Sequence, residues 1–236
     1  MSLIINPTIF REYDIRGTAS VDLSPCFSER LGFAYAQMIK GRVPAGGRES
    51  LTVSVGKDCR LSSDSYADAV ISGLTRGGVN VIRLGFCPTP LTYFSLYHLD
   101  LDGAIMVTAS HNPPDQNGFK ICVGKETIYG HQIQELRSLM QSEIGRASQT
   151  GLVSDYEIIP AYIQFQRKNF PSFEGMRIAI DCGNGMAGLV APKLFRSLGI
   201  EVMDLYSNPD GRFPNHIPDP TIEEYMEDLA TTVRKT

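Results

Sequence analysis

The chain has 236 residues, 42% of them apolar and 20% charged, and its formal net charge is −4. This length suits one large domain or two of about 100 to 130 residues each, and the composition supports a buried core and excludes a disordered chain. The absence of Lys/Arg runs argues against nucleic-acid binding and polybasic membrane binding. No apolar run reaches the ~18 to 20 residues of a membrane span. We expect no nucleic-acid and no membrane partner.

The first part of the chain predicts a βαβ arrangement. Strands are expected at 51–55, 79–84, 103–108 and 119–123, and helices at 24–40 and 62–75. Ser24-Pro25 is a typical helix start, Ser62 and Ser63 are candidate caps for the second helix, and Gly41 and Gly77-Gly78 are typical helix ends. A strand, a helix and a strand in that order predict a right-handed crossover onto a parallel sheet.

A similar plan follows a small, polar stretch at 145–155, which we interpret as a linker. Helices are predicted at 158–169, 189–197 and 221–236, strands at 176–181 and 200–205, and a tight turn at 183–188. The fold class expected is therefore α/β, with two similar βαβ-based domains and mixed, mostly parallel sheets. The domains would span 1–148 and 154–236, with few strands in the second, which looks incomplete.

The segment 108–121, TASHNPPDQNGFKI, carries the strongest chemical signal. Ser110 and His111 directly follow a predicted buried strand, and open α/β sheets place ligands at the carboxyl ends of their strands. Lys120 returns on the next strand. A serine that carries a phosphoryl group needs mainly cations and hydrogen-bond donors around it, which His111, Lys120 and a further arginine would supply.

This segment resembles the phosphoserine loop of the α-D-phosphohexomutases, specifically the phosphomannomutase/phosphoglucomutase type. It meets the pattern T-A/G-S-H-N-P-x-x-x-N-G-x-K at every fixed position. The order of other segments agrees with the same family: FREYDIRG at 10–17, VGKDCRLSS at 55–63, PTP at 88–90, DCGNGMAG at 181–188 and FPNHIPDP at 213–220. The resemblance covers the chain from about residue 10 onward.

The resemblance implies an enzyme that interconverts hexose 1-phosphates and 6-phosphates through a hexose 1,6-bisphosphate. Ser110 would hold and donate the phosphoryl group, and a phosphate oxygen on it would help to bind Mg²⁺. His111 and Lys120 would flank the transfer site, with Lys120 as a proton carrier for the sugar hydroxyl. Arg16 would stabilise charge there, and Tyr13 would line the substrate cleft.

The sequence departs from the family pattern at the metal. The Asp-rich D-G-D-G-D-R loop that would hold Mg²⁺ does not occur in these residues. Asp100 and Asp102 form a D-x-D pair, but they precede a strand, where a solvated turn is the better interpretation. We therefore expect the N-terminal portion of a four-domain enzyme, which keeps the phosphoserine loop and does not turn over alone.

Two alternatives stay open. Gly183, Gly185 and Gly188 follow a strand and precede a helix, and Asp204 lies about 20 residues on, which is the outline of a dinucleotide-binding fingerprint; a tight turn without a ligand is the plainer interpretation. The second alternative is a non-catalytic binding module in which Ser110 never carries phosphate.

The remaining histidines and the cysteines give weaker signals. His98 is expected to pack, His131 to be exposed at a helix start, and His216 to border the cleft or support a turn. The five cysteines include no Cys-x-x-Cys pair. We therefore expect no structural zinc site, and free thiols in a cytoplasmic protein.

Overall fold

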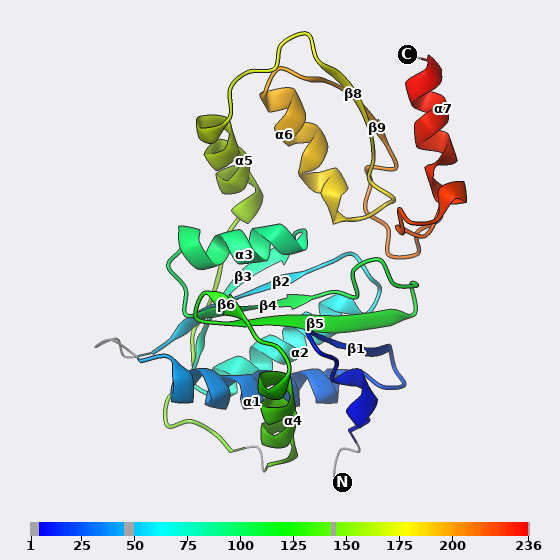
Figure 1. Cartoon of the computed structure of the whole chain (residues 1–236). Helices are drawn as coiled ribbons and strands as arrows, with labels where there is room; N and C mark the ends of the chain where they lie inside the picture. Colours follow the sequence, from blue (N-terminus) through cyan, green and yellow to red (C-terminus); the bar gives the residue numbers. More distant parts are fainter. Residues whose placement is uncertain (1–4, 45–49, 143–144, 236) are drawn as a thin grey trace.

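The computed structural model describes residues 5–44, 50–142 and 145–235 of the chain. They form two α/β units, of which the second lies above the first in Figure 1. Within the described residues, no helix is both long enough and apolar enough to cross a bilayer.

One seven-stranded sheet forms the centre of the first unit. Its path runs β1 (Ile15–Thr18), β5 (Gln116–Val123), β4 (Gly103–Val107), β2 (Thr52–Lys57), β3 (Asn80–Phe86) and β7 (Val153–Asp155), and β6 (Glu126–Thr127) pairs with β5. The strands β4, β2, β3 and β7 are parallel, whereas β5 runs antiparallel to its neighbours β4 and β1. This confirms the expected mixed, mostly parallel sheet.

Helices cover both faces of this sheet. The helices α1 (Pro25–Arg42), α2 (Ser63–Arg76) and α4 (His131–Gln141) lie on one side, and α3 (Thr89–His98) lies on the other, facing the second unit (Figure 1). A short 3₁₀ helix, Pro7–Ile9, precedes β1. At the start of α1 the Phe27 N–H donates to Ser24 Oγ at 3.1 Å, which confirms Ser24 as the cap.

Two details of the helix ends differ from the sequence-based predictions. The helix α1 passes through Gly41 and ends at Arg42, because this glycine does not adopt the left-handed backbone that ends a helix. No side chain caps α2. The Ser62 hydroxyl accepts from Asn117, and the Ser63 hydroxyl donates to Asp58, so both hydroxyls anchor other segments.

Two glycines bring α1 and α2 into direct backbone contact. A Cβ on Gly32 would lie 2.2 Å from the Val70 carbonyl oxygen, and one on Gly73 would lie 2.0 Å from the Glu29 carbonyl oxygen. The main apolar core lies between this helix pair and the sheet and includes fully buried Leu31. The close approach therefore depends on the absence of side chains at both glycines.

The second unit contains a two-stranded parallel sheet, β8 (Arg177–Asp181) and β9 (Glu201–Leu205), between α6 (Ala191–Ser197) and α7 (Glu227–Lys235) (Figure 1). The helix α5 (Ile158–Asn169) precedes it, and 3₁₀ turns lie at Met186–Leu189 and Glu223–Met226. Every residue of β8 and β9 is exposed or half-buried. This contrasts with β4, which is buried throughout.

The stretch 145–155, expected to be a linker, includes the edge strand β7. Its residues pair with Val81–Arg83 of β3, and Arg83 makes a two-pronged ion pair with Asp155 at 2.7 and 2.9 Å. This strand was not predicted, because it is short and all three of its residues are exposed. The division into domains at 1–148 and 154–236 remains a proposal. The strand β7 extends the first sheet beyond residue 148.

Aromatic residues join α3 to the segment that enters the second unit. The Phe94 ring meets Tyr162 edge-on with centroids 5.3 Å apart and stacks on His98 at 4.9 Å. The His98 Nε2 atom lies 2.9 Å from the Tyr156 hydroxyl. His98 therefore packs as expected, although its outer side stays exposed.

Candidate functional site

Ser110 lies just beyond the carboxyl end of β4, on the loop that leads to β5. Its φ angle is 59°, in the left-handed region that non-glycine residues seldom adopt, and its N–H donates to Thr108 Oγ1 at 2.9 Å. The Ser110 side chain is exposed, and its Oγ lies 3.4 Å from His111 Nδ1. The loop thus holds a hydroxyl at the sheet edge, with an imidazole beside it.

A buried side chain and a glycine hold the end of this loop at β5. Asn117 is completely buried, and its side-chain amide donates to Ser62 Oγ at 2.8 Å and to Ser63 Oγ at 3.0 Å. At Gly118 a Cβ would lie 2.1 Å from the Ile15 carbonyl oxygen, so only glycine lets β5 come this close to β1. The Asn-Gly pair therefore fixes where the loop rejoins the sheet.

The two predicted cations meet at a residue that sequence reasoning missed. One oxygen of Asp14 (Oδ2) accepts from Arg16 Nε at 2.8 Å and from Lys120 Nζ at 3.1 Å. Arg16 also reaches the Ser110 loop, where its Nη1 donates to Asn112 Oδ1 at 2.8 Å. Asp14 directly precedes β1, and the two-residue alternation of an extended chain puts residues 14 and 16 on the same side, which is the signal that could have identified Asp14.

Arg60 is a second residue to which the sequence assigned no role. Its segment was noted only as a family landmark, yet its guanidinium donates to carbonyl groups of the Ser110 loop. Tyr13 differs from the other predicted residues. It is 68% exposed, and its side chain makes no hydrogen bond within the described residues.

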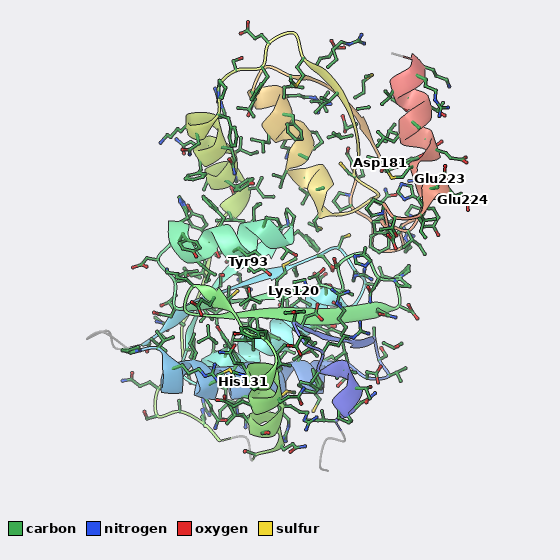
Figure 2. All side chains as sticks on the ribbon, in the orientation of Figure 1. Tyr93, Lys120, His131, Asp181, Glu223 and Glu224 are labelled. Atoms are coloured by element: carbon green, nitrogen blue, oxygen red, sulfur yellow. The ribbon has the colours of Figure 1, made fainter. Side chains whose placement is uncertain are left out.

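A cleft of about 250 Å³ opens between the two units at Ser110. Thr108, Ser110 and Met106 line it from the first unit, and Gly185 and Phe213 line it from the second. Figure 2 marks Lys120 on β5 and Asp181 at the end of β8, one from each unit. The exposed hydroxyl therefore faces a space that both units enclose.

The loop that follows β9 also interacts electrostatically with the Ser110 loop, through Asp219 and His111. Hydrogen bonds from Thr221 lower the pKa of Asp219, and the neighbouring His111 contributes in the same direction. Next to Asp219, His216 binds Asp181, with Nε2 3.0 Å from Oδ2. His216 thus supports the turn beside the cleft, one of the two roles expected for it.

The described residues do not form a metal centre. No group of three or more His, Cys, Asp or Glu side chains among them is arranged to hold a metal ion. Asp58, which lines the cleft, binds Arg60 and Ser63, and Asp181 at the end of β8 binds His216. Asp102, expected in a solvated turn, is instead buried and accepts from the Thr52 N–H at 2.8 Å.

The glycine pattern at 183–188 folds as a closed turn. The Gly183 N–H donates to Asp181 Oδ1 at 2.8 Å, and the N–H groups of Gly185 and Gly188 donate to main-chain carbonyl oxygens. Asp204, the candidate ribose ligand, is paired with Arg196. A dinucleotide pyrophosphate needs free N–H groups at a helix start. These contacts support the turn and argue against the fingerprint.

Two family models match the chain. Residues 7–145 match "phosphoglucomutase/phosphomannomutase, alpha/beta/alpha domain I", and residues 160–236 match domain II of the same family. The chain belongs to the phosphoglucomutase/phosphomannomutase family. The resemblance inferred from the TASHNP loop and its companion segments is confirmed.

Individual relatives agree with this family. The chain is 39% identical over 232 residues to a phosphomannomutase/phosphoglucomutase of Pseudomonas aeruginosa, covering 96% of this chain and 48% of the relative. It is 35% identical over 227 residues to a phosphoglucomutase of Neisseria meningitidis, covering 96% and 48%. The chain spans about half the length of the curated relatives it matches.

A solved structure shows the same fold. The crystal structure of a phosphoglucomutase/phosphomannomutase family protein from Burkholderia thailandensis superposes with a TM-score of 0.90 at 33% identity. The match covers 99% of this chain and 51% of that one. The arrangement of the two units described above is therefore shared with a crystallised member of the family.

Proposed function

We propose that this chain supplies the phosphoryl-carrying part of a phosphohexomutase, which interconverts hexose 1-phosphate and hexose 6-phosphate through a hexose 1,6-bisphosphate. The observation that carries the proposal is the placement of Ser110. It is an exposed hydroxyl at the carboxyl end of β4, on a strained backbone, in the cleft between the two units. Family membership supports the substrate class.

In the proposed reaction, phosphorylated Ser110 gives its phosphoryl group to the free hydroxyl of a hexose monophosphate. The Ser110 Oγ–P bond breaks, a P–O bond to the sugar forms, and the sugar hydroxyl loses its proton while Ser110 regains one. The resulting bisphosphate turns around and returns its other phosphoryl group to Ser110. Positioning and charge neutralisation supply most of the catalysis in such transfers.

The other residues have proposed roles that follow from their positions. Arg16 stabilises the charge of the moving phosphoryl group, and its contact with Asn112 places it beside the Ser110 loop. Lys120 is the proposed proton carrier for the sugar hydroxyl, and His111 flanks the transfer site. Tyr13 is proposed to line the substrate cleft, where its exposure leaves the ring free to contact a sugar.

Mg²⁺ is the metal we propose for the family reaction, with the Ser110 phosphate as the contribution from this chain. Among the described residues, no group of three or more His, Cys, Asp or Glu side chains is arranged to hold this ion. We also propose a cytoplasmic phosphoprotein, in keeping with cysteines that are free in the structure.

The experiment that tests this function is phosphoryl incorporation. The chain is incubated with labelled hexose 1,6-bisphosphate and Mg²⁺, beside Ser110→Ala and the control Ser72→Ala, which removes an exposed hydroxyl of α2. We expect label on wild type and on Ser72→Ala, and none on Ser110→Ala. Equal label on Ser110→Ala would contradict the proposal, as would unlabelled wild type purified without phosphate.

We further propose that these 236 residues do not complete the mutase cycle alone. Robust conversion of hexose 1-phosphate to 6-phosphate by this chain, with no other polypeptide added, would contradict that. The non-catalytic alternative predicts no phosphate on Ser110 under any of these conditions.

A further inference from the structure

Arg60 is a charged side chain almost sealed inside the first unit, with 2% of its surface exposed. Its Nη1 donates to the carbonyl oxygens of Pro113 at 2.6 Å and Gln116 at 3.0 Å, and its Nη2 to those of Ser110 at 2.9 Å and Asn112 at 2.6 Å. One guanidinium thus binds four main-chain carbonyls of the loop that carries Ser110.

The fifth donor of the guanidinium orients the group. Arg60 Nε donates to Asp58 Oδ2 at 3.2 Å, while the other oxygen of Asp58 accepts from the Arg60 N–H at 3.0 Å and from Ser63 Oγ at 2.6 Å. Burial lowers the pKa of Arg60, and Asp58 opposes that shift. The carboxylate therefore compensates the buried charge and fixes the plane of the fork.

The hydrogen bonds of Arg60 distinguish it from the cations proposed to contact substrate. A guanidinium has five N–H donors, and all five are occupied within the protein. No donor is left for a phosphate oxygen. Arg60 therefore acts on the reaction through the backbone of the Ser110 loop.

The second unit contacts Arg60 and the backbone next to it through the loop that contains Gly211 and Phe213. The Phe213 ring lies over the guanidinium, with the Arg60 Cζ atom 5.2 Å from the ring centroid. A Cβ on Gly211 would lie 2.2 Å from the Cys59 carbonyl oxygen, so this loop touches the backbone beside Arg60. Phe213 also lines the cleft that contains Ser110.

We propose that Arg60 is a positioning residue for phosphoryl transfer at Ser110. By binding carbonyl groups of the loop from Ser110 to Gln116, it holds Ser110 in its strained left-handed conformation, and Phe213 of the second unit holds Arg60 in place. This inference rests on the proposed function. A planar fork is required, because an ammonium cannot reach two pairs of carbonyls at once.

The test compares Arg60→Lys and Arg60→Gln with Tyr35→Phe. The control loses a buried hydrogen bond to the Cys122 carbonyl, away from the loop, so it lowers stability by a comparable mechanism. Two quantities are measured in the whole chain: amide hydrogen exchange over residues 110–116, and the rate at which labelled hexose 1,6-bisphosphate phosphorylates Ser110.

We expect Arg60→Lys to keep the fold while loop exchange rises and phosphorylation slows, each by at least about tenfold, because several charge-assisted hydrogen bonds are lost. Tyr35→Phe should leave both within about twofold of wild type, since it does not touch the loop. Loop exchange and phosphorylation in Arg60→Lys that match the control would overturn the inference.

A further variant covers the case in which Arg60 substitutions do not fold. Phe213→Leu removes the ring over the guanidinium and leaves Arg60 intact. We expect faster exchange at residues 110–116 with unchanged exchange in α4, and unchanged loop exchange would overturn the role given to Phe213. If wild type takes no label, the proposed function fails, whereas the exchange data still decide whether Arg60 positions the loop.

Discussion

Asp14 and Lys120 are 106 positions apart in the chain, yet their charged groups lie 3.1 Å apart in the structure. Asp14 is 8% exposed, and the same carboxylate oxygen that accepts from Lys120 also accepts from Arg16. A buried carboxylate shared by two cations holds both at a fixed distance from the Ser110 loop. Asp14 thus binds both Arg16, the proposed charge-stabilising group, and Lys120, the proposed proton carrier.

Replacing Asp14 with Asn tests whether Arg16 and Lys120 depend on this carboxylate. The amide keeps the shape of the carboxylate but loses its charge, so both cations lose a charge-assisted partner worth roughly 1.5 to 3 kcal/mol. We expect phosphorylation of Ser110 to slow by about 10- to 100-fold. Asp68→Asn, an exposed change on α2, is the control. Phosphorylation at the wild-type rate in Asp14→Asn would show that Arg16 and Lys120 do not depend on Asp14.

Two glycine-to-alanine substitutions should change stability in opposite directions. In α2, Gly73→Ala drives a methyl group against the Glu29 carbonyl of α1, and overpacking of this kind costs typically 1 to 3 kcal/mol. In α1, Gly41→Ala meets nothing within 4 Å, so helix propensity should stabilise the protein by roughly 0.5 to 1 kcal/mol. Chemical denaturation measures both. Equal effects of the two changes would contradict the close contact of these helices.

The sequence predicted regular elements well where one feature dominated. The buried strand β4 was located because its apolar residues are continuous, and Ser24-Pro25 marked the start of α1. Sequence-based prediction failed where a polar side chain has more than one available hydrogen-bond partner. Ser62 looks like a helix cap, but Asn117 uses its hydroxyl. Such a choice depends on a contact between distant segments.

The candidate site shows the same limit. Ser110, His111 and Lys120 were identified because they share one loop and its return strand. Arg60 binds carbonyl groups 50 and 53 positions away, and such contacts cannot be identified from a linear pattern because any carbonyl can accept. The role of Asp14 likewise needed β1 and β5 to be paired in register.

The stability of the second unit should depend on pH through His216. Burial by itself lowers the pKa of His216, but the Ile217 carbonyl and Asp181 outweigh it, and the net pKa is raised above 6.5. A raised pKa in the folded state means that the contribution to stability is present below the unfolded value and is lost as pH rises through the folded value. We therefore expect the unfolding free energy to fall as pH increases above about 6.5.

The measurement is thermal or chemical unfolding over that pH range for wild type, His216→Asn and His131→Asn. His131 is exposed at the start of α4, so its substitution should leave the pH dependence unchanged. The difference between wild type and His216→Asn should shrink as pH rises. A difference that grows with pH would show that the pairing with Asp181 has the opposite sign.

The closed turn at 183–188 predicts that NAD does not bind. A ligand at 100 times its dissociation constant stabilises a protein by about 2.7 kcal/mol, which a thermal shift readily detects. We expect no change in melting temperature with added NAD. A shift that Gly188→Ala abolishes would revive the dinucleotide alternative, although that substitution also places a methyl group 1.9 Å from the Ser207 carbonyl oxygen and so lowers stability.

The most direct measurement for the central role of Ser110 is the intact mass of the purified chain before and after phosphatase treatment, beside Ser110→Ala. We expect wild-type protein to carry one phosphate that phosphatase removes, and Ser110→Ala to carry none. Wild-type protein that never carries phosphate, or the same phosphate on Ser110→Ala, would contradict it.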